Sequence, residues 1–454
     1  MKARTHRLLA AICILLLSIA LCACNAPQPT AQTDQPAISK KTPRPTFTPV
    51  GAQSQDTPTQ PPVATEAAEA TEEAAEPPAE PTATTAGESS SGEEPTAAPP
   101  PTPVPTDPPA PKSLTMASPE YGMQVFMWWR PEVASRDLQM VKAAGFSWVK
   151  VNFGWREIEG AGKGQFDWSR TDKIMEMITN DGMDAIIRVD HQPEWVGGGF
   201  PVNGPPNNLT DLGDFLSAMA TRYKGQIRAY QVWNEPNLSR EWGDQVPDPA
   251  RYVEMMGVAY AAIKAADPNA MVVSAGLSPT GTWSDEARPD DWYLASMYEV
   301  MGGNSDGYFD VLGAHAPGFL YAPETDPSVA ASDSHGQRAF CFRRVEDLRD
   351  VMVKYGDGDK QIAILEFGWT SDSRPDSPYA WHSVSEEVKA DYLVRAYQYA
   401  RDNWSPWIGL MSLIYVCDPD WTTEHEQYYW AINDPSYPEF SPRPAYTALQ
   451  NMPK

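Results

Sequence analysis

Tyr230-Gln-Val-Trp-Asn-Glu-Pro-Asn237 is the stretch that decides the fold, because an apolar, strand-like run ends there at the carboxylate of Glu235. Ala363-Ile-Leu-Glu-Phe-Gly-Trp369 repeats the arrangement and places Glu366 at the end of a second run. The two glutamates are far apart in the sequence, so they can meet only where a fold brings distant strand ends to one face. A parallel β-barrel does this, since the loops at the C-terminal ends of its strands form one site. The two stretches therefore predict a site with paired carboxylates.

From about residue 118 onward, apolar runs rich in β-formers alternate with helical patterns. Candidate strands cover residues 122–127, 148–153, 184–189, 227–233, 271–275, 309–314, 361–365 and 408–416. Candidate helices cover residues 133–144, 170–179, 212–223, 252–266, 292–301, 337–355, 386–400 and 444–451. Eight alternating units predict an α/β fold, a (β/α)8 TIM barrel over residues 117–454. A doubly wound open sheet is the alternative, but the strand count and the absence of a Gly-rich first turn disfavour it.

The N-terminal residues have the pattern of a secretory signal over residues 1–23. Basic residues within the first seven positions precede an apolar run over 8–21, which is too short to span a bilayer comfortably. The run ends at Ala23-Cys24, which resembles a bacterial lipoprotein signal, and the resemblance implies lipidation of Cys24 as the new N-terminus. The alternative is an ordinary cleaved signal peptide with an incidental cysteine.

Residues 24–116 are rich in Pro, Thr, Ala, Glu and Ser, are nearly free of aromatic side chains and lack apolar periodicity. Such a segment cannot bury enough surface to fold, so we expect a disordered tether. A flexible chain of this length has an end-to-end distance of roughly 50 Å. Together with a lipid anchor at Cys24, the tether predicts a domain held outside the bacterial membrane, in the cell envelope.

The composition disfavours several classes of partner. With 60 acidic against 35 basic residues, the net charge is −25, which does not suit binding to nucleic acid. A neutral polymer suits such a surface better, although acidity by itself mostly reports solubility. The sequence contains no Cys-x-x-Cys, no His-Glu-x-x-His and no phosphate-cradling Gly loop, so no metal, nucleotide or other cofactor is expected.

Cys341 and Cys417 are the two cysteines that fall in the predicted barrel. Outside the cytoplasm, an isolated pair can form a disulfide. Two buried free thiols are the alternative, since Cys is among the residues most often buried. The sequence leaves both possibilities open.

The residues around the two glutamates suit acid and base chemistry. Glu235 follows Trp233 and Asn234, and a neighbouring aromatic can raise the pKa of a carboxyl by desolvation and keep it protonated as an acid. Glu366 lies between the apolar pairs Ile364-Leu365 and Phe367-Gly368. The alternative is that both are salt-bridged residues at the rim of the barrel.

Two motifs carry a more specific resemblance. Trp233-Asn-Glu-Pro-Asn-Leu238, followed by Trp242, resembles the fourth-strand motif of retaining glycoside hydrolases with a (β/α)8 barrel, the clan of cellulases, mannanases and β-xylosidases. Glu366-Phe-Gly-Trp369 is similar to the seventh-strand nucleophile motif of that clan. Asn-Glu-Pro-Asn is nearest to family 39, whereas Asp190-His191 looks more like family 5. The sequence lacks the β-sandwich typical of family 39, which leaves the family and the substrate open.

The resemblance implies roles for individual residues. Glu235 would be the acid/base and Glu366 the nucleophile, and Asn234 would bind the sugar 2-hydroxyl. His191 and His315, at the ends of the third and sixth strands, would line the sugar subsite; a satisfied core histidine is the alternative for each. Aromatic side chains would form the floor under the sugar, although burial in the core is their default. These are Tyr415, Trp421 and Trp369, extended by Trp128, Trp129 and Trp195.

The function expected from these features is that of a tethered extracellular glycosidase, cleaving a β-linked polysaccharide or oligosaccharide with retention, without a cofactor and as a monomer. A non-catalytic carbohydrate-binding lipoprotein on the same barrel is the alternative, and turnover would separate the two. A surface adhesin is a third possibility, but the sequence reveals no protein-binding patch. The glycan, its linkage and endo or exo action depend on loop shapes that the sequence does not specify.

Overall fold

The structure, a computed structural model, describes residues 114–333 and 336–454. The predicted signal peptide, Cys24 and nearly all of the predicted tether lie outside these residues. Within the described part of the chain, no helix is both long and apolar enough to cross a membrane.

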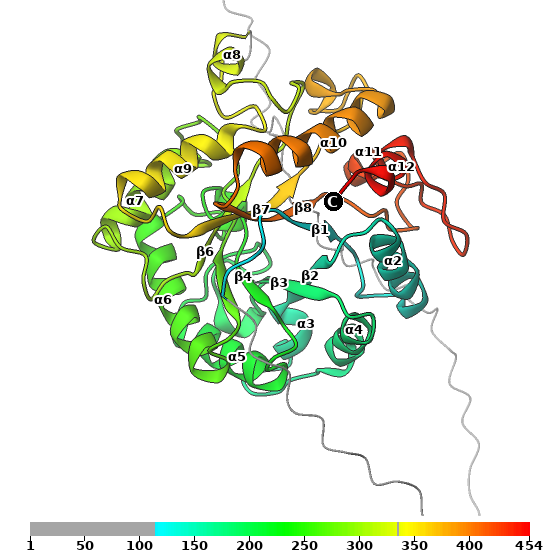
Figure 1. Cartoon of the computed structure of the whole chain (residues 1–454). Helices are drawn as coiled ribbons and strands as arrows, with labels where there is room; N and C mark the ends of the chain where they lie inside the picture. Colours follow the sequence, from blue (N-terminus) through cyan, green and yellow to red (C-terminus); the bar gives the residue numbers. More distant parts are fainter. Residues whose placement is uncertain (1–113, 334–335) are drawn as a thin grey trace, which may run out of the picture. The chain divides into compact units, whose positions relative to one another are not determined.

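Eight parallel strands form a closed barrel in sequence order (Figure 1), which confirms the predicted (β/α)8 fold. The strands are β1 (Glu120–Gln124), β2 (Trp148–Gly154), β3 (Asp184–Asp190), β4 (Ala229–Val232), β5 (Met271–Ser274), β6 (Val311–His315), β7 (Gln361–Phe367) and β8 (Ile408–Leu413). β1 pairs with both β2 and β8, so the barrel has no open edge.

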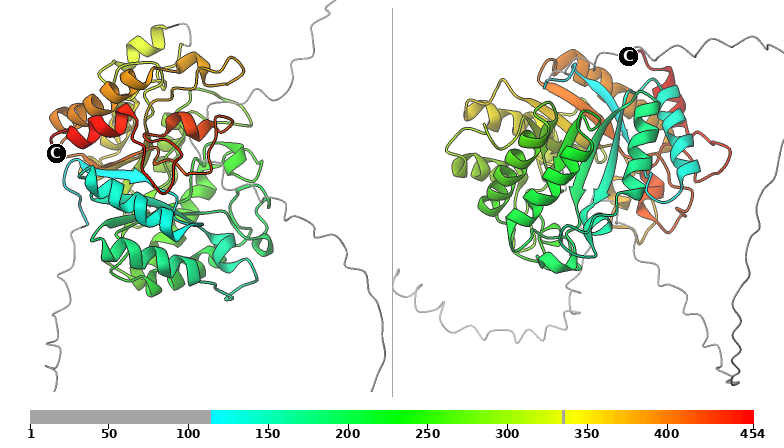
Figure 2. Two further views of the ribbon diagram at one scale, coloured as in Figure 1. Left: turned by 90° about the vertical axis from the view of Figure 1, so that its right-hand side faces the viewer. Right: turned by 90° about the horizontal axis from the view of Figure 1, so that it is seen from below.

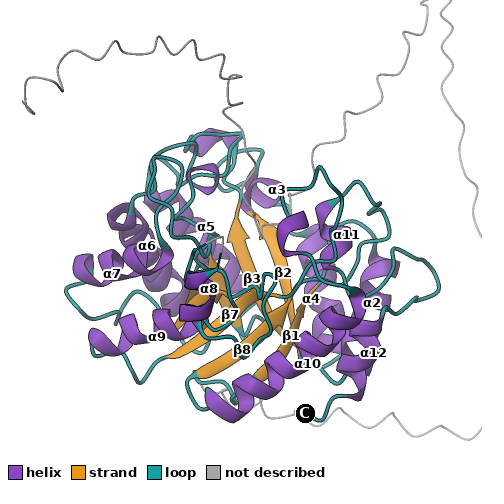
Figure 3. Cartoon of the chain, turned by 90° about the horizontal axis from the view of Figure 1, so that it is seen from above, coloured by secondary structure: helices purple, strands orange, loops and turns teal. Residues whose placement is uncertain are grey.

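Helices surround the strands (Figure 3). They are α2 (Pro131–Ala143), α3 (Trp155–Glu159), α4 (Ser169–Asn180), α5 (Leu209–Arg222), α6 (Pro249–Ala266), α7 (Asp290–Val300), α8 (Pro327–Ser332), α9 (Arg344–Lys354), α10 (Glu386–Asn403), α11 (Glu426–Trp430) and α12 (Pro444–Asn451). Short 3-10 turns lie at Glu194–Val196, Ser239–Glu241 and Ala380–His382. The predicted helix 337–355 is corrected, because residues 337–343 form turns and α9 begins only at Arg344.

The helix ring closes through α12, which lies between α10 and α2 (Figure 2). Its Tyr446 hydroxyl donates to the Met140 carbonyl of α2 at 3.0 Å. This contact ties the last helix of the chain to the first helix of the barrel.

The inside of the barrel has an apolar base and a polar upper layer. The base is formed by Met116, Trp148, Ile186, Ala229, Met271, Val273, Val311, Ala363, Leu365 and Leu410. Because side chains alternate along a strand, the next inward residues after Trp148 and Ile186 are Lys150 and Arg188. Both are at most 1 % exposed. The barrel thus holds charged groups just below the ends of its strands, where the site of such a fold lies.

A β-bulge in β7 changes the alternation at the position of Glu366. Ala314 of β6 pairs with Ile364, but the next residue, His315, pairs with Glu366. The extra residue, Leu365, faces the barrel base, and Glu366 beside it also faces inward. Bulges next to functional sites commonly re-aim a side chain in this way.

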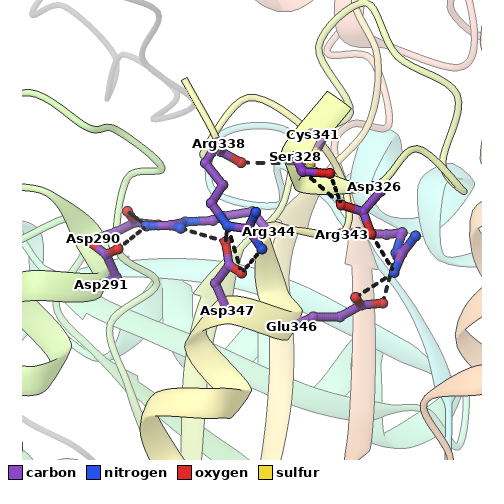
Figure 4. A network of polar contacts seen from close by, with 10 residues as sticks. All are labelled: Asp290, Asp291, Asp326, Ser328, Arg338, Cys341, Arg343, Arg344, Glu346 and Asp347. Atoms are coloured by element: carbon purple, nitrogen blue, oxygen red, sulfur yellow. Dashed lines mark hydrogen bonds and ion pairs between the residues drawn. The ribbon is translucent and has the colours of Figure 1, made fainter. Parts of the chain in front are cut away.

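A network of ion pairs fixes the segment between β6 and α9 to the helix layer (Figure 4). Arg344 binds both carboxylate oxygens of Asp290, at 2.7 and 3.0 Å, and its Nη1 lies 2.6 Å from Asp347. Arg343 pairs with Glu346 at 2.8 Å. The N-termini of α7 and α9 are thereby joined.

The two cysteines of the barrel are free thiols. Both are buried, and each sulfur lies near a local carbonyl oxygen, Cys341 at 3.8 Å from Arg338 O and Cys417 at 3.5 Å from Asp418 O. Burial raises the pKa of each thiol to about 12. The second of the two alternatives, buried thiols, therefore describes this structure.

Candidate active site

Glu235 and Glu366 meet at the mouth of the barrel. Nδ1 of His315 lies 3.1 Å from Oε1 of Glu235 and 4.0 Å from Oε2 of Glu366. One ring nitrogen of His315 thus lies within 4.0 Å of a carboxylate oxygen of each glutamate. Both glutamates are 0 % exposed and His315 is 1 % exposed. They form ion pairs, but inside the barrel mouth, which contradicts the alternative of rim residues.

Two cations inside the barrel hold Glu366. Nζ of Lys150 lies 2.7 Å from its Oε1, and Nη1 of Arg188 lies 3.6 Å from the same oxygen. Lys150 also donates to the Leu365 carbonyl at 3.2 Å. Burial lowers the pKa of Lys150 to about 8, although the negative charge of Glu366 opposes this. Lys150 thus contacts both the carboxylate of Glu366 and the backbone beside it, and so fixes the position of this side chain.

The backbone around Glu235 is held in an unusual conformation. Trp233 and Glu235 have φ angles of 72° and 37°, in the left-handed region that non-glycine residues rarely adopt. Nε1 of Trp233 donates to Glu241 O at 2.8 Å, and the amide of Glu235 donates to Gly276 O at 3.1 Å. Such conformations cost energy and persist mainly where the surroundings fix them, often at functional sites.

Gly276 is placed where no side chain fits. A Cβ added there would lie 2.1 Å from Cδ2 of His315. The same glycine accepts the amide of Glu235, so its backbone lies against both residues. The lack of a side chain at this position allows the His315 ring to reach Glu235.

Arg240 is the second partner of Glu235. Its Nη2 lies 2.8 Å from Oε2 of Glu235, so His315 and Arg240 contact different oxygens of one carboxylate. The Arg240 side chain is 35 % exposed, whereas Glu235 is fully buried. Arg240 lies in the 3-10 turn Ser239–Glu241 of the loop that follows β4.

His191 lies beside this network through Asp190. Nδ1 of His191 contacts Oδ1 of Asp190, and Nε of Arg188 lies 2.8 Å from Oδ2 of Asp190. Burial opposes ionisation of Asp190, but Arg188 and His191 outweigh it and hold the pKa of this carboxyl below its usual value. Burial also disfavours a charged His191, yet Asp190 outweighs it and raises the pKa of the imidazole. Successive contacts between charged groups thus connect His191 through Asp190 and Arg188 to Glu366.

Asn234 is fully buried next to Glu235. Its Oδ1 accepts from Nε2 of Gln231 at 3.4 Å. Its predicted contact with a sugar hydroxyl stays a prediction, as do the roles of the other site residues.

Tyr415 and Trp421 belong to an aromatic cluster at the end of β8. The Tyr415 ring lies 5.6 Å from Trp421 and 5.7 Å from Phe126. Burial raises the pKa of Tyr415 well above its usual value, and the negative charge of nearby Glu366 adds to this. Tyr415 therefore lies in the electrostatic field of the proposed nucleophile. The role of Tyr415 and Trp421 at the sugar subsite stays a prediction.

Trp369 and Trp128 do not line the site. Trp369 is fully buried among core residues, where its Nε1 donates to Tyr321 O at 2.9 Å and its ring packs edge-on against Tyr392 of α10. Trp128 packs against Phe153, whose side chain faces the helix layer. The prediction that these two rings form the floor under the sugar is therefore corrected.

Trp129 and Trp195, which would also extend this floor, make other contacts. Trp129 is 56 % exposed and lies under Arg170 of α4, and Trp195 donates to Glu159 O.

Sequence reasoning missed Lys150, Arg188 and Arg240. The first two could have been found, because each is a charged residue at an inward position of an apolar strand, in Trp148–Gly154 and Asp184–Asp190. Arg240 offered no such signal, since a basic residue in a loop is usually solvated.

Comparisons with known proteins concern the family and the fold of this chain. Residues 113–300 match the model of the cellulase family, glycosyl hydrolase family 5. Endo-1,4-beta-xylanase A of Phanerodontia chrysosporium is 29 % identical over 113 residues, which is 24 % of this chain and 27 % of that protein. The chain thus spans about a quarter of that curated relative.

Solved structures share the barrel. A family 39 glycoside hydrolase from the gut symbiont Bacteroides cellulosilyticus WH2 superposes with a TM-score of 0.50 at 16 % identity, over 73 % of this chain and 63 % of that one. A monomeric beta-xylosidase from Caulobacter crescentus CB15 superposes with a TM-score of 0.51 at 18 % identity, over 74 % and 69 % of the two chains. At these identities the likeness concerns the fold alone. Together with the matching family model, it confirms the resemblance at the level of the clan.

Proposed function

We propose that this chain, a (β/α)8-barrel glycoside hydrolase of the clan that contains cellulases and β-xylosidases, hydrolyses β-glycosidic bonds with retention of configuration. The observation that carries the proposal is the meeting of Glu235 and Glu366 at one ring nitrogen of His315. Retaining enzymes hold their carboxyl groups roughly 5 to 5.5 Å apart, whereas inverting enzymes need roughly 6.5 to 9.5 Å to admit a water molecule. The contacts of His315 with one oxygen of each glutamate bring the two carboxyl groups to the same ring, which supports the shorter, retaining separation.

The two glutamates have different surroundings, which supports different roles. Glu366 is ion-paired with Lys150 inside the barrel, whereas Glu235 contacts His315 and the partly exposed Arg240. It would attack the anomeric carbon while Glu235 passes its proton to the leaving oxygen and the glycosidic bond breaks. In the second step Glu235 would take a proton from water, and the oxygen of that water would replace Glu366 on the sugar.

A β-linked xylan or xylo-oligosaccharide is the first substrate to test. The matched stretch of a xylanase and the family 5 model both support a β-linked glycan. Reducing-sugar release over xylans, β-glucans, mannans and galactans would identify the substrate. Failure to cleave any of these glycans would favour the non-catalytic alternative.

Proton NMR of the first-formed sugar tests the mechanism. A β-anomer released from a β-linkage means retention, and an initial α-anomer would contradict it. Glu366→Ala should abolish turnover because no covalent intermediate can form. Glu235→Ala should spare substrates with good leaving groups, and azide should restore part of its second step. Full activity in either variant would show that the roles are wrongly assigned.

We further propose that the barrel is tethered to the outside of the bacterial membrane as a monomer. The Ala23-Cys24 signal and the Pro- and Thr-rich segment support this arrangement. Two acyl chains give stable anchoring where one is marginal. Cys24→Ser should move the protein from the membrane fraction to the soluble fraction, and equal retention of both forms would contradict the anchor.

A further inference from the structure

Arg240 contacts Oε2 of Glu235, the oxygen that His315 does not contact. His315 contacts Oε1 from within the barrel, while Arg240 contacts Oε2 and is 35 % exposed. A sugar that takes a proton from Oε2 of Glu235 must therefore lie next to Arg240. The acid of a glycosidase lies beside the leaving-group oxygen, so Arg240 lies on the leaving-group side.

The backbone that carries Arg240 is fixed, but its side chain extends toward solvent. Nε1 of Trp233 donates to Glu241 O at 2.8 Å, and the amide of Ser239 donates to Glu286 O at 2.9 Å. The 3-10 turn is thus tied on both sides of Arg240. A change of partner for this arginine requires only rotation of its own long side chain.

The contact has a chemical consequence for the first step of the reaction. A guanidinium beside a carboxylate favours the ionised form of that carboxylate. Glu235 must carry a proton when the leaving group departs. The ion pair with Arg240 therefore opposes protonation of Glu235 until the guanidinium binds another group.

The other acidic side chains near Arg240 compete weakly for it. Burial raises the pKa of Glu241, and it raises that of Glu426 to about 8. Oε2 of Glu241 also accepts from Nδ2 of Asn203 at 2.7 Å. Glu235 is accordingly the partner that a negatively charged substrate group would replace.

We propose that Arg240 recognises a carboxylate on the leaving-group sugar, so that the preferred substrate is a β-linked glycan with a uronic acid on that side. By exchanging Glu235 for this carboxylate, the guanidinium releases Oε2 of Glu235 from its ion pair before the proton is donated. The inference rests on the proposed function and names the substrate class of the same site.

Two aryl glycosides separate charge from leaving-group ability. The 4-carboxyphenyl and 4-chlorophenyl β-xylosides, with the matching β-glucosides, release phenols of similar acidity, but only the former carry an anionic group. We expect the intact chain to show a kcat/KM at least about tenfold higher for the carboxyphenyl compound, the effect of one charge-assisted contact. Arg240→Met should reduce this ratio to about one, and Arg240→Lys should restore part of it.

Arg288 provides the matched control. It lies in the neighbouring loop, over the ring of Trp283 at 5.0 Å, and Arg288→Met should leave the ratio unchanged. Equal turnover of the two compounds by the intact chain, or a ratio that persists in Arg240→Met, would overturn the inference while leaving the proposed function standing. If neither the aryl xylosides nor the aryl glucosides are cleaved although a glycan of the panel is, the inference fails and the proposed function stands; if no glycan is cleaved either, both fail.

Discussion

Nζ of Lys150 and Oε1 of Glu366 lie 2.7 Å apart inside the barrel, and neither side chain is more than 1 % exposed. A buried ion pair is seldom a strong source of stability by itself. Removal of one partner is costly, however, because it leaves the other charge buried and uncompensated.

Lys150→Met should therefore lower both stability and activity. We expect a loss of about 3–5 kcal/mol in the free energy of unfolding, and a fall in kcat because Glu366 loses the ion pair that holds its carboxyl group in place. Lys389→Met is the matched control, since Lys389 is 0 % exposed and pairs with Glu386 at 2.9 Å outside the site. Denaturant titration and steady-state kinetics measure the two effects. If both variants keep the same kcat as the intact chain, Lys150 has no role in the reaction.

Gly276→Ala should disturb catalysis without altering any ionisable group. The new Cβ would lie 2.1 Å from His315, so the ring must move away from Glu235. We expect kcat/KM to fall on the order of 100-fold, the effect of a displacement of about 1 Å at an active site. Gly257→Ala in α6 is the control, because its Cβ would only meet the Tyr308 ring at 3.4 Å. Unchanged kinetics in Gly276→Ala would show that the position of His315 does not matter.

Glu426→Gln should change how stability depends on pH. Burial raises the pKa of Glu426 from 4.5 to about 8, so the folded chain binds this proton more tightly than the unfolded chain. The stabilisation from that proton is complete below pH 4.5 and is lost as the pH rises through about 8. Glutamine does not titrate, so the variant should gain stability relative to the intact chain between these two pH values.

Thermal unfolding of the two proteins at pH 4.5, 6, 7 and 9 measures this gain. Glu424→Gln, at an exposed residue of the same loop, should give a constant difference across the series. A constant difference for Glu426→Gln as well would show that its carboxyl does not titrate between pH 4.5 and 8.

Arg344→Met should destabilise the helix layer strongly. Its guanidinium is 4 % exposed and binds Asp290, which is 0 % exposed (Figure 4). Loss of this arginine should cost about 3–5 kcal/mol. Arg338→Met is the comparison, because the exposed pair of Arg338 and Asp347 should contribute at most about 1 kcal/mol. Similar denaturation midpoints for the two variants would contradict the expected difference.

The sequence predicted the barrel because each strand is an apolar run with its own boundary. The final helix, Pro444–Asn451, has the predicted limits, and most strands agree within two or three residues. The helix predicted over 337–355 fails over its first third, residues 337–343, where Phe340 packs on Phe319 and Trp381 instead of continuing the helical periodicity. Tertiary contacts of a loop outweighed a local pattern there.

The two glutamates could be found because they end apolar strands, but their partners could not all be found. Lys150 and Arg188 lie within apolar strands and not at the strand ends, so a search of the strand ends does not find them. Trp128 and Trp369 were assigned to the site because they follow strands, yet their rings turn toward the helix layer. Sequence shows where a residue occurs along a strand, but the direction of a side chain just beyond the strand end depends on local backbone geometry.

The bulge at Leu365 determines which side chains at the end of β7 face into the barrel. Residues before it alternate in one phase, and Glu366 faces inward only because one additional residue shifts that phase. Without the bulge, the same residues would alternate strictly, and Glu366, after the inward Leu365, would point into the helix layer. Deletion of one residue here would instead return this glutamate to an inward position of a regular strand, so the eight strands and the inward carboxylate could both survive the loss of one codon.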